Sequence, residues 1–235
     1  MSLGILYLFP GPLSETEIEI VLPKHNIDLI KTIKHFIAED AKTARRFLKL
    51  CAYPNIQDAE IALLNEHTES NTVGSLLEPL LKGHNVGLMS DAGCPGIADP
   101  GAEVVKLAHK KGIRVLPWVG PSSIVLTIMA SGFNGQNFAF NGYLPIEKDK
   151  RVKRIKELEL FAVKHKQAQY FIETPYRNTQ LFADLLASLN PSTQLCLGIN
   201  LTDAAQQVIT KSVSEWKNIK APEIHKIPAV FGIYF

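Results

Sequence analysis

Short apolar runs rich in β-branched and aromatic residues recur along the first half of the chain, with amphipathic stretches between them. The runs are typical of buried strands and span residues 5–9, 32–37, 61–64, 86–89 and 114–116. Helical patterns lie between them at 25–33, 41–51, 73–82 and 102–111, and Gly83 and Gly112 stand where the last two should end. This alternation predicts a mainly parallel sheet covered by helices on both faces.

The second half has wider strand spacing and ends on a series of strands. We expect helices at 124–131, 147–166 and 175–189, and strands at 138–140, 170–173, 194–200, 208–213 and 229–235, with a turn at 142–145. Ser122 or Ser123 would cap the first of these helices. The pattern predicts an α/β protein of two α/β domains with mainly parallel or mixed sheets, residues 1–117 and 118–235.

Composition is that of a soluble globular protein, with 46% hydrophobic and 20% charged residues and a net charge of +2. Three widely spaced cysteines and the lack of a Cys/His zinc spacing favour a reduced, cytoplasmic protein without a metal. No apolar run approaches twenty residues and no signal-peptide core is present, so we expect no membrane association.

The loop 90–101 is the most distinctive segment, because it follows an apolar strand and is dense in Gly, Pro and Asp. Loops at the carboxyl ends of strands bind ligands in open α/β sheets. Glycines there let backbone approach a ligand, and prolines hold the loop in one shape. The two commonest phosphate-binding motifs are absent from the sequence. The alternative is an ordinary turn between strand and helix.

An ordered set of short motifs resembles a known family. The motifs are Ser90-Asp91-Ala92-Gly93-x-Pro95, Asp99-Pro100-Gly101, Gly120-Pro121-Ser122, Ser131-Gly132-Phe133, Gly142-Tyr143-Leu144-Pro145 and Glu173-Thr174-Pro175-Tyr176-Arg177. In this order the chain resembles the tetrapyrrole methylase superfamily of class III S-adenosylmethionine-dependent methyltransferases. Within it, the chain is most similar to the bacterial family that methylates the ribose 2′-oxygen of cytidine in 16S ribosomal RNA.

The resemblance implies a homodimer of two-domain subunits that hold S-adenosylmethionine in the cleft between the domains and act on the small ribosomal subunit or its RNA. It implies that the cofactor pocket is formed by Pro10, Asp91, Ala92, Gly93, Cys94, Ile97, Ser122, Ser123, Tyr143, Leu144 and Thr174. A ribose hydroxyl acceptor needs a base within hydrogen-bond reach. Glu39 and Glu173, each at the end of an expected strand, are the candidate catalytic residues. His67 also qualifies by chemistry, but lone histidines are more often surface or core residues.

The chain departs from the family pattern near its end. The family's Arg-Glu-Leu-Thr-Lys is Ile199-Asn200-Leu201-Thr202-Asp203 here, and its Lys-Gly-Glu is Lys226-Ile227-Pro228. Ala38-Glu39-Asp40 is kept, but Ala41-Lys42 replaces Thr-Arg. Two alternatives therefore stay open: methylation of a tetrapyrrole or another small molecule, and a non-catalytic paralogue that binds S-adenosylmethionine.

Several candidate residues also have a purely structural interpretation. Asp91 would accept a hydrogen bond from a ribose hydroxyl or an amine, or would only shape its loop. Asp99-Pro100-Gly101 is typical of a helix start with Asp99 as N-cap, and Asp40 fits the N-cap of the 41–51 helix. Basic residues at 42–49 and 148–156 would neutralise phosphates or form solvated helix faces. Cys94 is a nucleophile or a small packing residue, and Arg177 pairs with an acid of the other domain or lies on a helix surface.

Overall fold

The computed structural model describes residues 2–64 and 73–235, and it divides into two compact units, Met1–Ser122 and Ser123–Phe235. The division falls between the last strand of the first unit and the first helix of the second. The boundary expected from the sequence, between residues 117 and 118, lies at the end of that strand.

The first unit is built on a five-stranded sheet in which every pair of neighbours is parallel. Its strands are β1 (Ile5–Phe9), β2 (His35–Ala38), β3 (Glu60–Leu63), β4 (Val86–Met89) and β5 (Arg114–Pro117), in the order β3-β2-β4-β1-β5. All four residues of β4 are buried, as a central strand covered on both faces requires.

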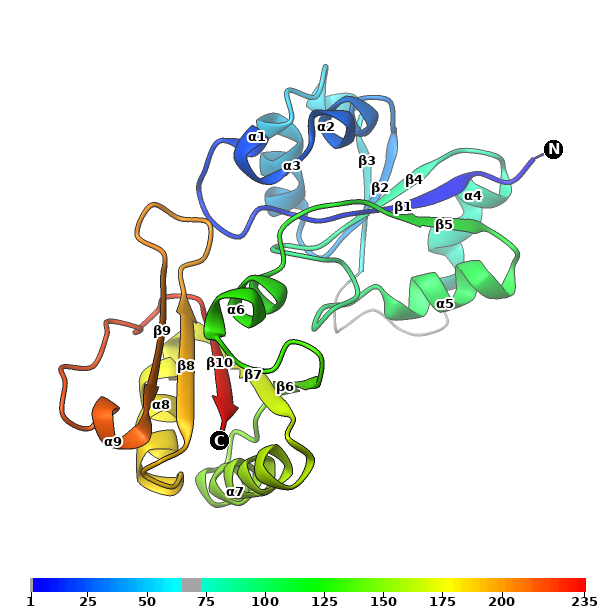
Figure 1. Cartoon of the computed structure of the whole chain (residues 1–235). Helices are drawn as coiled ribbons and strands as arrows, with labels where there is room; N and C mark the ends of the chain where they lie inside the picture. Colours follow the sequence, from blue (N-terminus) through cyan, green and yellow to red (C-terminus); the bar gives the residue numbers. More distant parts are fainter. Residues whose placement is uncertain (1, 65–72) are drawn as a thin grey trace. The chain divides into compact units, whose positions relative to one another are not determined.

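Helices cover both faces of this sheet (Figure 1). One face packs on α1 (Ile18–Val21), α2 (Lys24–Ile30) and α3 (Ala41–Leu50) through a core that includes Phe9, Ile30 and Phe47. The other packs on the 3₁₀ segment η2 (Val73–Leu77), α4 (Glu78–Leu81) and α5 (Ala102–Lys110) through Leu77, Leu88 and Val104. A short 3₁₀ turn, η1 (Ile56–Asp58), leads into β3.

The second unit also has five strands, but its sheet is mixed. The strands are β6 (Phe138–Tyr143), β7 (Ala168–Ile172), β8 (Gln194–Ile199), β9 (Gln207–Ser212) and β10 (Ala229–Tyr234), in the order β6-β7-β10-β8-β9. β6 and β7 are parallel, and the other three pairings are antiparallel.

One face of the second sheet packs on α7 (Lys148–His165), α8 (Asn178–Ser188) and α9 (Val213–Trp216). The other face packs on the end of α6 (Ser123–Ser131) and on Phe133, around Tyr170. The 3₁₀ turn η3 (Pro175–Arg177) lies between β7 and α8.

The α/β fold predicted from the sequence is confirmed, with local differences. The strand expected at 32–37 begins at His35, and the turn expected at 142–145 starts inside β6, where Gly142 has a φ of +62° and the pairing with β7 shifts. The four-residue helices α1 and α9 were not predicted. Among the described residues, no helix is both long and apolar enough to cross a membrane.

Candidate functional site

The centre of the first sheet is a topological switch point. β4 lies between β2 and β1. From β1 and β2 the chain continues into α1–α3 on one face, whereas from β4 it continues into α5 on the other. Connections that leave neighbouring strands toward opposite faces open a crevice at the carboxyl ends of those strands, where α/β proteins bind their ligands.

Three of the segments expected to bind the cofactor meet at this point. After β1 and β4, Gly11 and Gly93 form an antiparallel bridge whose two N–H···O distances are 2.8 and 3.1 Å. A Cβ atom on Gly120 would lie 2.5 Å from the Pro10 ring, so the segment after β5 also packs here. The Cys94 thiol donates to the Pro121 carbonyl at 3.6 Å. The structure therefore brings Pro10, Gly93, Cys94 and residues 120–122 together.

The backbone at this point is suited to close approach by a ligand. Gly93 has a φ of +77°, a conformation that favours glycine, and an added Cβ would lie 3.4 Å from the Leu13 side chain. Ile97 is about half exposed in the same loop. Burial and the nearby Asp99 raise the pKa of the Cys94 thiol, which favours a packing role over a nucleophilic one.

Three carboxyl groups gather at the adjoining ends of β2 and β4. Glu39 directly follows β2, and the β2–β4 register, which pairs Ile37 with Leu88, brings it to residues 90–91. Its Oε1 is buried without a hydrogen-bond partner among the described residues. Burial, followed by the charges of Asp99 and Asp91, raises the pKa of Glu39 to about 7, against the opposing effect of the Asp91 backbone amide. Burial also raises the pKa values of Asp91 and Asp99.

The predicted N-cap role of Asp99 is wrong. α5 begins at Ala102 with Gly101 as its N-cap residue, and Gly101 has a φ of +130° and no side chain with which to cap. Asp99 instead accepts a 2.7 Å hydrogen bond from the Ser90 hydroxyl, whose oxygen accepts from the Ala92 backbone N–H at 3.2 Å. Asp99 therefore ties the far side of the loop to the end of β4. By contrast, the predicted N-cap role of Asp40 is confirmed by a 2.7 Å hydrogen bond from the Thr43 backbone.

The raised pKa of Glu39 predicts a pH-dependent effect on stability. Because the folded-state pKa of about 7 lies above the ordinary value of 4.5, this group contributes less to stability as pH rises from 4.5 to 7. We expect Glu39→Gln to be more stable than the unmodified chain at pH 8, by on the order of 1 kcal/mol after allowance for solvent screening. The difference should shrink toward pH 4.5, as measured by thermal unfolding. An equal difference at both pH values would show that the carboxyl titrates normally.

In the second unit, Glu173 lies immediately after β7 with its side chain only 1% exposed. Its Oε1 accepts hydrogen bonds from the Thr174 backbone and the Arg177 guanidinium, both at 2.6 Å. Its Oε2, the Nε of Arg177 and the Oδ1 of Asn178 are buried without partners among the described residues. Such a group of unpaired polar atoms marks a place where water or a ligand is accommodated. Arg177 thus pairs with an acid of its own unit.

The other residues of the second unit that were expected to bind the cofactor have different environments. Tyr143 is half exposed and lies near Arg177, where it adds to the effect of Glu173 in raising the pKa of the guanidinium. Thr174 is partly buried beside them. The side chain of Leu144 is 3% exposed and belongs to the hydrophobic core, so only its backbone is available to a ligand. Ser123 is the first residue of α6.

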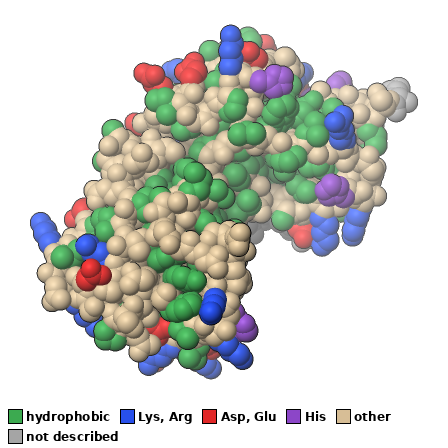
Figure 2. All heavy atoms as spheres, in the orientation of Figure 1, with side chains coloured by type: hydrophobic (Ala, Val, Ile, Leu, Met, Phe, Trp, Pro, Cys, Tyr) green, Lys and Arg blue, Asp and Glu red, His purple; other side chains and the backbone are tan. Residues whose placement is uncertain are grey.

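The basic residues at 148–156 were expected either to neutralise phosphates or to form a solvated helix face, and several of them are paired with acidic residues of their own unit. Arg151 is 2% exposed and forms an ion pair with Asp184, while Lys150 pairs with Glu147 and Arg154 with Glu157. On the face shown in Figure 2, acidic and basic side chains are interspersed. The altered segment at 199–203 covers the last residue of β8 and the start of the turn to β9, where Asn200 has a φ of +51°.

The residues of the switch point fit an adenosine-bearing sulfonium compound. Glycine backbone, proline rings and partly exposed aliphatic side chains suit the base, while Asp91 suits the hydroxyl or amine donors of such a compound. The unpaired oxygen of Glu39 is left for a donor on the methyl acceptor. Sequence reasoning did not include Ser90 among the site residues, although its position between the strand and Asp91 indicated a place in the site. The role of Gly11 could not be recognised from the sequence, because its bridge partner, Gly93, is distant along the chain. His67 lies outside the described residues.

Comparison with known proteins identifies the relatives of this chain. No protein-family model matches it. The chain is 30% identical over 220 residues to the ribosomal RNA small subunit methyltransferase I of Bacillus subtilis, covering 92% of this chain and 71% of the relative. It is 31% identical over 210 residues to the protein of that name from Leptospira biflexa, covering 88% of this chain and 81% of the relative. The chain belongs to the ribosomal RNA small subunit methyltransferase I family.

One further relative and two solved structures are also similar to this chain, and the solved structures show that the fold is shared. The Vibrio cholerae member is 29% identical over 204 residues, covering 87% of this chain and 67% of that protein. Among solved structures, the methyltransferase CobJ aligns with a TM-score of 0.64 at 15% identity, covering 98% of this chain and 94% of CobJ. The cobalt precorrin-4 methyltransferase CbiF aligns with a TM-score of 0.61 at 13% identity, over 98% of this chain and 94% of CbiF. The resemblance identified from the sequence motifs is confirmed.

Proposed function

We propose that this protein transfers a methyl group from S-adenosylmethionine to a ribose 2′-hydroxyl of small-subunit ribosomal RNA. The observation that carries the proposal is the meeting of the strand ends after β1, β4 and β5 at the switch point, beside an unpaired glutamate oxygen. It is supported by membership in a family whose members are named ribosomal RNA small subunit methyltransferases.

We assign the donor site to the residues predicted for it. In the first unit these are Pro10, Asp91, Ala92, Gly93, Cys94, Ile97 and Ser122, and in the second Ser123, Tyr143, Leu144 and Thr174. S-adenosylmethionine supplies a methyl group bound to a positively charged sulfur. The protein's task is to hold that group in line with the attacking oxygen, and positioning of this kind lowers the barrier by several kcal/mol.

Glu39 is the proposed general base. As the acceptor oxygen bonds to the methyl carbon, the carbon–sulfur bond breaks and its electron pair stays on sulfur. The proton of the hydroxyl passes to the Glu39 carboxylate. A carboxyl with a pKa of about 7 is half ionised at neutral pH and retains good basicity, which suits this step. Glu173 is the second catalytic candidate, with one oxygen committed to Arg177 and the other unpaired.

The proposal includes a cytoplasmic homodimer. The three free cysteines, Cys51, Cys94 and Cys196, are compatible with a reducing compartment. The dimer is implied by the family resemblance alone. Light scattering after gel filtration tests it, and the expected molar mass is twice the 26.0 kDa of the chain.

Asp91→Ala tests the donor site. Loss of a charge-assisted hydrogen bond at this carboxylate is expected to weaken binding of S-adenosylhomocysteine by about tenfold or more. Isothermal titration calorimetry measures the change. Asp28→Ala, at an exposed position of α2, is the matched control and should bind as the unmodified protein does. Unchanged affinity for Asp91→Ala would mean that this residue only shapes its loop.

The activity is tested by transfer of labelled methyl groups to small ribosomal subunits from a strain that lacks the usual enzyme. Incorporation into the RNA at a ribose, mapped by resistance to alkaline cleavage, is the expected result. Binding of S-adenosylhomocysteine without transfer to these subunits would reject the ribosomal acceptor and favour a small-molecule acceptor or a non-catalytic protein. No binding at millimolar ligand would reject the methyltransferase proposal itself.

A further inference from the structure

A second recess lies beside the donor loop within the first unit. It has a volume of about 660 Å³, within the range of pockets that hold small organic ligands. Its walls come from the loop after β1 (residues 12–17), from one side of α3 and from residues 90–92 after β4. We call it the α3 cavity.

The walls of the α3 cavity combine apolar surface with hydrogen-bonding groups. Pro12, Leu13, Phe47 and Leu50 provide the apolar part. The polar part contains donors and acceptors, namely Ser14, Glu15, Thr16, Glu17, Thr43, Arg46, Ser90 and Asp91. A nucleobase has apolar faces and a polar edge, and proteins that bind single-stranded RNA recognise bases in this way, by packing on the faces and hydrogen bonding to the edges.

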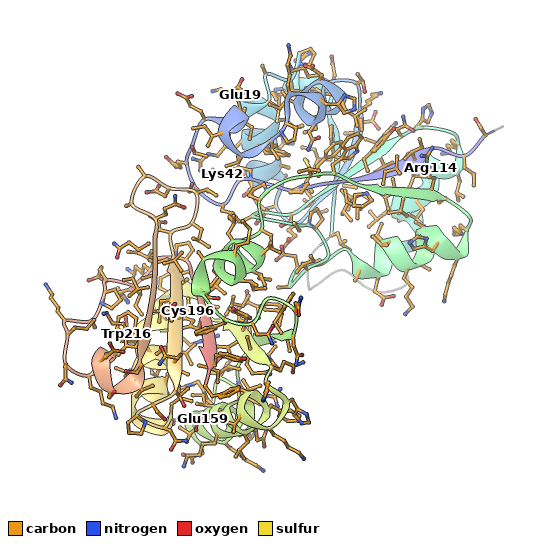
Figure 3. The ribbon with its side chains drawn as sticks, viewed as in Figure 1. Glu19, Lys42, Arg114, Glu159, Cys196 and Trp216 are labelled. Atoms are coloured by element: carbon orange, nitrogen blue, oxygen red, sulfur yellow. The ribbon has the colours of Figure 1, made fainter. Side chains whose placement is uncertain are left out.

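The cavity borders a basic helix. α3 carries Lys42, Arg45, Arg46 and Lys49, all exposed, and has no acidic residue. Lys42, at the start of α3, is labelled in Figure 3. Of these four basic residues, Arg46 is the one that lines the cavity. The helix therefore offers cationic groups for a polyanion next to a recess that suits a base.

Arg46 is free to change partner. It forms an ion pair with Glu15, which also lines the cavity, and the side chains of Arg46 and Glu15 are 60% and 82% exposed. Exposed ion pairs of this kind contribute little to stability, so breaking the pair with Glu15 in favour of a phosphate costs little free energy. The guanidinium would then bind two phosphate oxygens at once.

From this combination we propose that the α3 cavity binds one nucleotide of the single-stranded RNA acceptor, with the base among Leu13, Phe47 and Leu50 and its phosphate on Arg46. The inference rests on the proposed function, because it supplies the acceptor side of the methyl transfer. The proposal also links the acceptor site to the donor site. Asp91 and Ala92 line the cavity and belong to the donor loop, so a nucleotide held here has its sugar close to the carboxyl end of β4.

The test uses nuclear magnetic resonance of the full isotope-labelled chain. The probes are the four nucleoside 5′-monophosphates, inorganic phosphate and S-adenosylhomocysteine, each added separately. At least one nucleotide is expected to shift the amide signals of Thr16, Thr43 and Arg46, while phosphate leaves those of Thr16 unchanged. The proposal is overturned if no nucleotide shifts these signals, or if phosphate reproduces the shifts. It is also overturned if S-adenosylhomocysteine competes with the nucleotide, since the cavity would then hold the donor.

Two variants separate cavity binding from general attraction to the basic helix. Arg46→Ala is expected to weaken nucleotide binding by roughly tenfold, whereas Arg45→Ala, at the neighbouring position that is also exposed but outside the cavity, should leave it unchanged. Thr16→Trp, which fills the cavity, should abolish nucleotide binding and leave the affinity for S-adenosylhomocysteine unchanged. Equal losses for Arg45→Ala and Arg46→Ala would overturn the proposal. Failure of the unmodified protein to bind S-adenosylhomocysteine, with nucleotide binding intact, would refute the proposed function and leave the cavity assignment standing.

Discussion

Glu39→Gln is expected to lower kcat for methyl transfer by about 10²–10⁴-fold, the usual contribution of a positioned general base. Glutamine has nearly the same shape but cannot accept the proton. Because the side chain acts on the acceptor hydroxyl, the dissociation constant of S-adenosylhomocysteine should stay within about twofold of the original.

The pH dependence distinguishes this role from a structural one. In the unmodified protein, kcat should rise with pH up to about 7, following ionisation of Glu39, and then level off. Glu39→Gln should lose this rise. Asp40→Asn is the matched control, because asparagine caps a helix as well as aspartate does, so α3 and kcat should be retained. A Glu39→Gln protein with kcat within threefold of the original would exclude Glu39 as the base and leave Glu173 as the candidate.

The second large effect concerns the buried ion pair of the second unit. Arg151 and Asp184 join α7 to α8 through bonds from Nε and Nη2 to Oδ2, at 2.8 and 2.6 Å, and their side chains are 2% and 9% exposed. Arg151 also donates to the carbonyls of Pro145 and Ile146. Asp184→Ala leaves this arginine buried without its counter-charge, so the free energy of unfolding should fall by about 3–5 kcal/mol.

Urea unfolding followed by Trp216 fluorescence measures this loss. Trp216 is buried in the second unit, and a Trp118→Phe background removes the other tryptophan. Glu157→Gln breaks the half-exposed pair with Arg154 and serves as the control, with an expected cost below about 1 kcal/mol. Replacing both partners, as in Arg151→Met with Asp184→Leu, should recover much of the stability. A cost for Asp184→Ala no larger than that for Glu157→Gln would show that the pair contributes nothing specific.

The sequence predicted those elements whose signal is local. β4 is a continuous apolar run, as expected of a strand buried on both faces, and α3 has an Asp40 cap and a strong polar–apolar division. α1 and α9 were missed because four residues carry little more than one turn of periodicity. The antiparallel pairings of β8, β9 and β10 depend on which strands become neighbours, and the sequence of a single segment does not predict its neighbours.

The candidate site was predictable to the level of its strand ends and no further. The composition of loop 90–101 marked it as a candidate site, but its Asp-Pro-Gly pattern gave a wrong helix cap. Ser90 forms a hydrogen bond with Asp99, nine residues along the chain, and α5 begins at Ala102 with Gly101 as its N-cap residue. The elevated pKa of Glu39 depends first on burial and then on the charges of Asp99 and Asp91, which belong to the loop after β4. The α3 cavity depends on the course of the loop after β1, which sequence periodicity does not determine.

The most direct test of the central claim is a crystal structure of the protein with S-adenosylhomocysteine. The account predicts ligand density against the Gly11–Gly93 bridge and Asp91, with the α3 cavity left for the acceptor. Density for the ligand in the α3 cavity, or at any place away from the carboxyl ends of β1 and β4, would contradict this prediction.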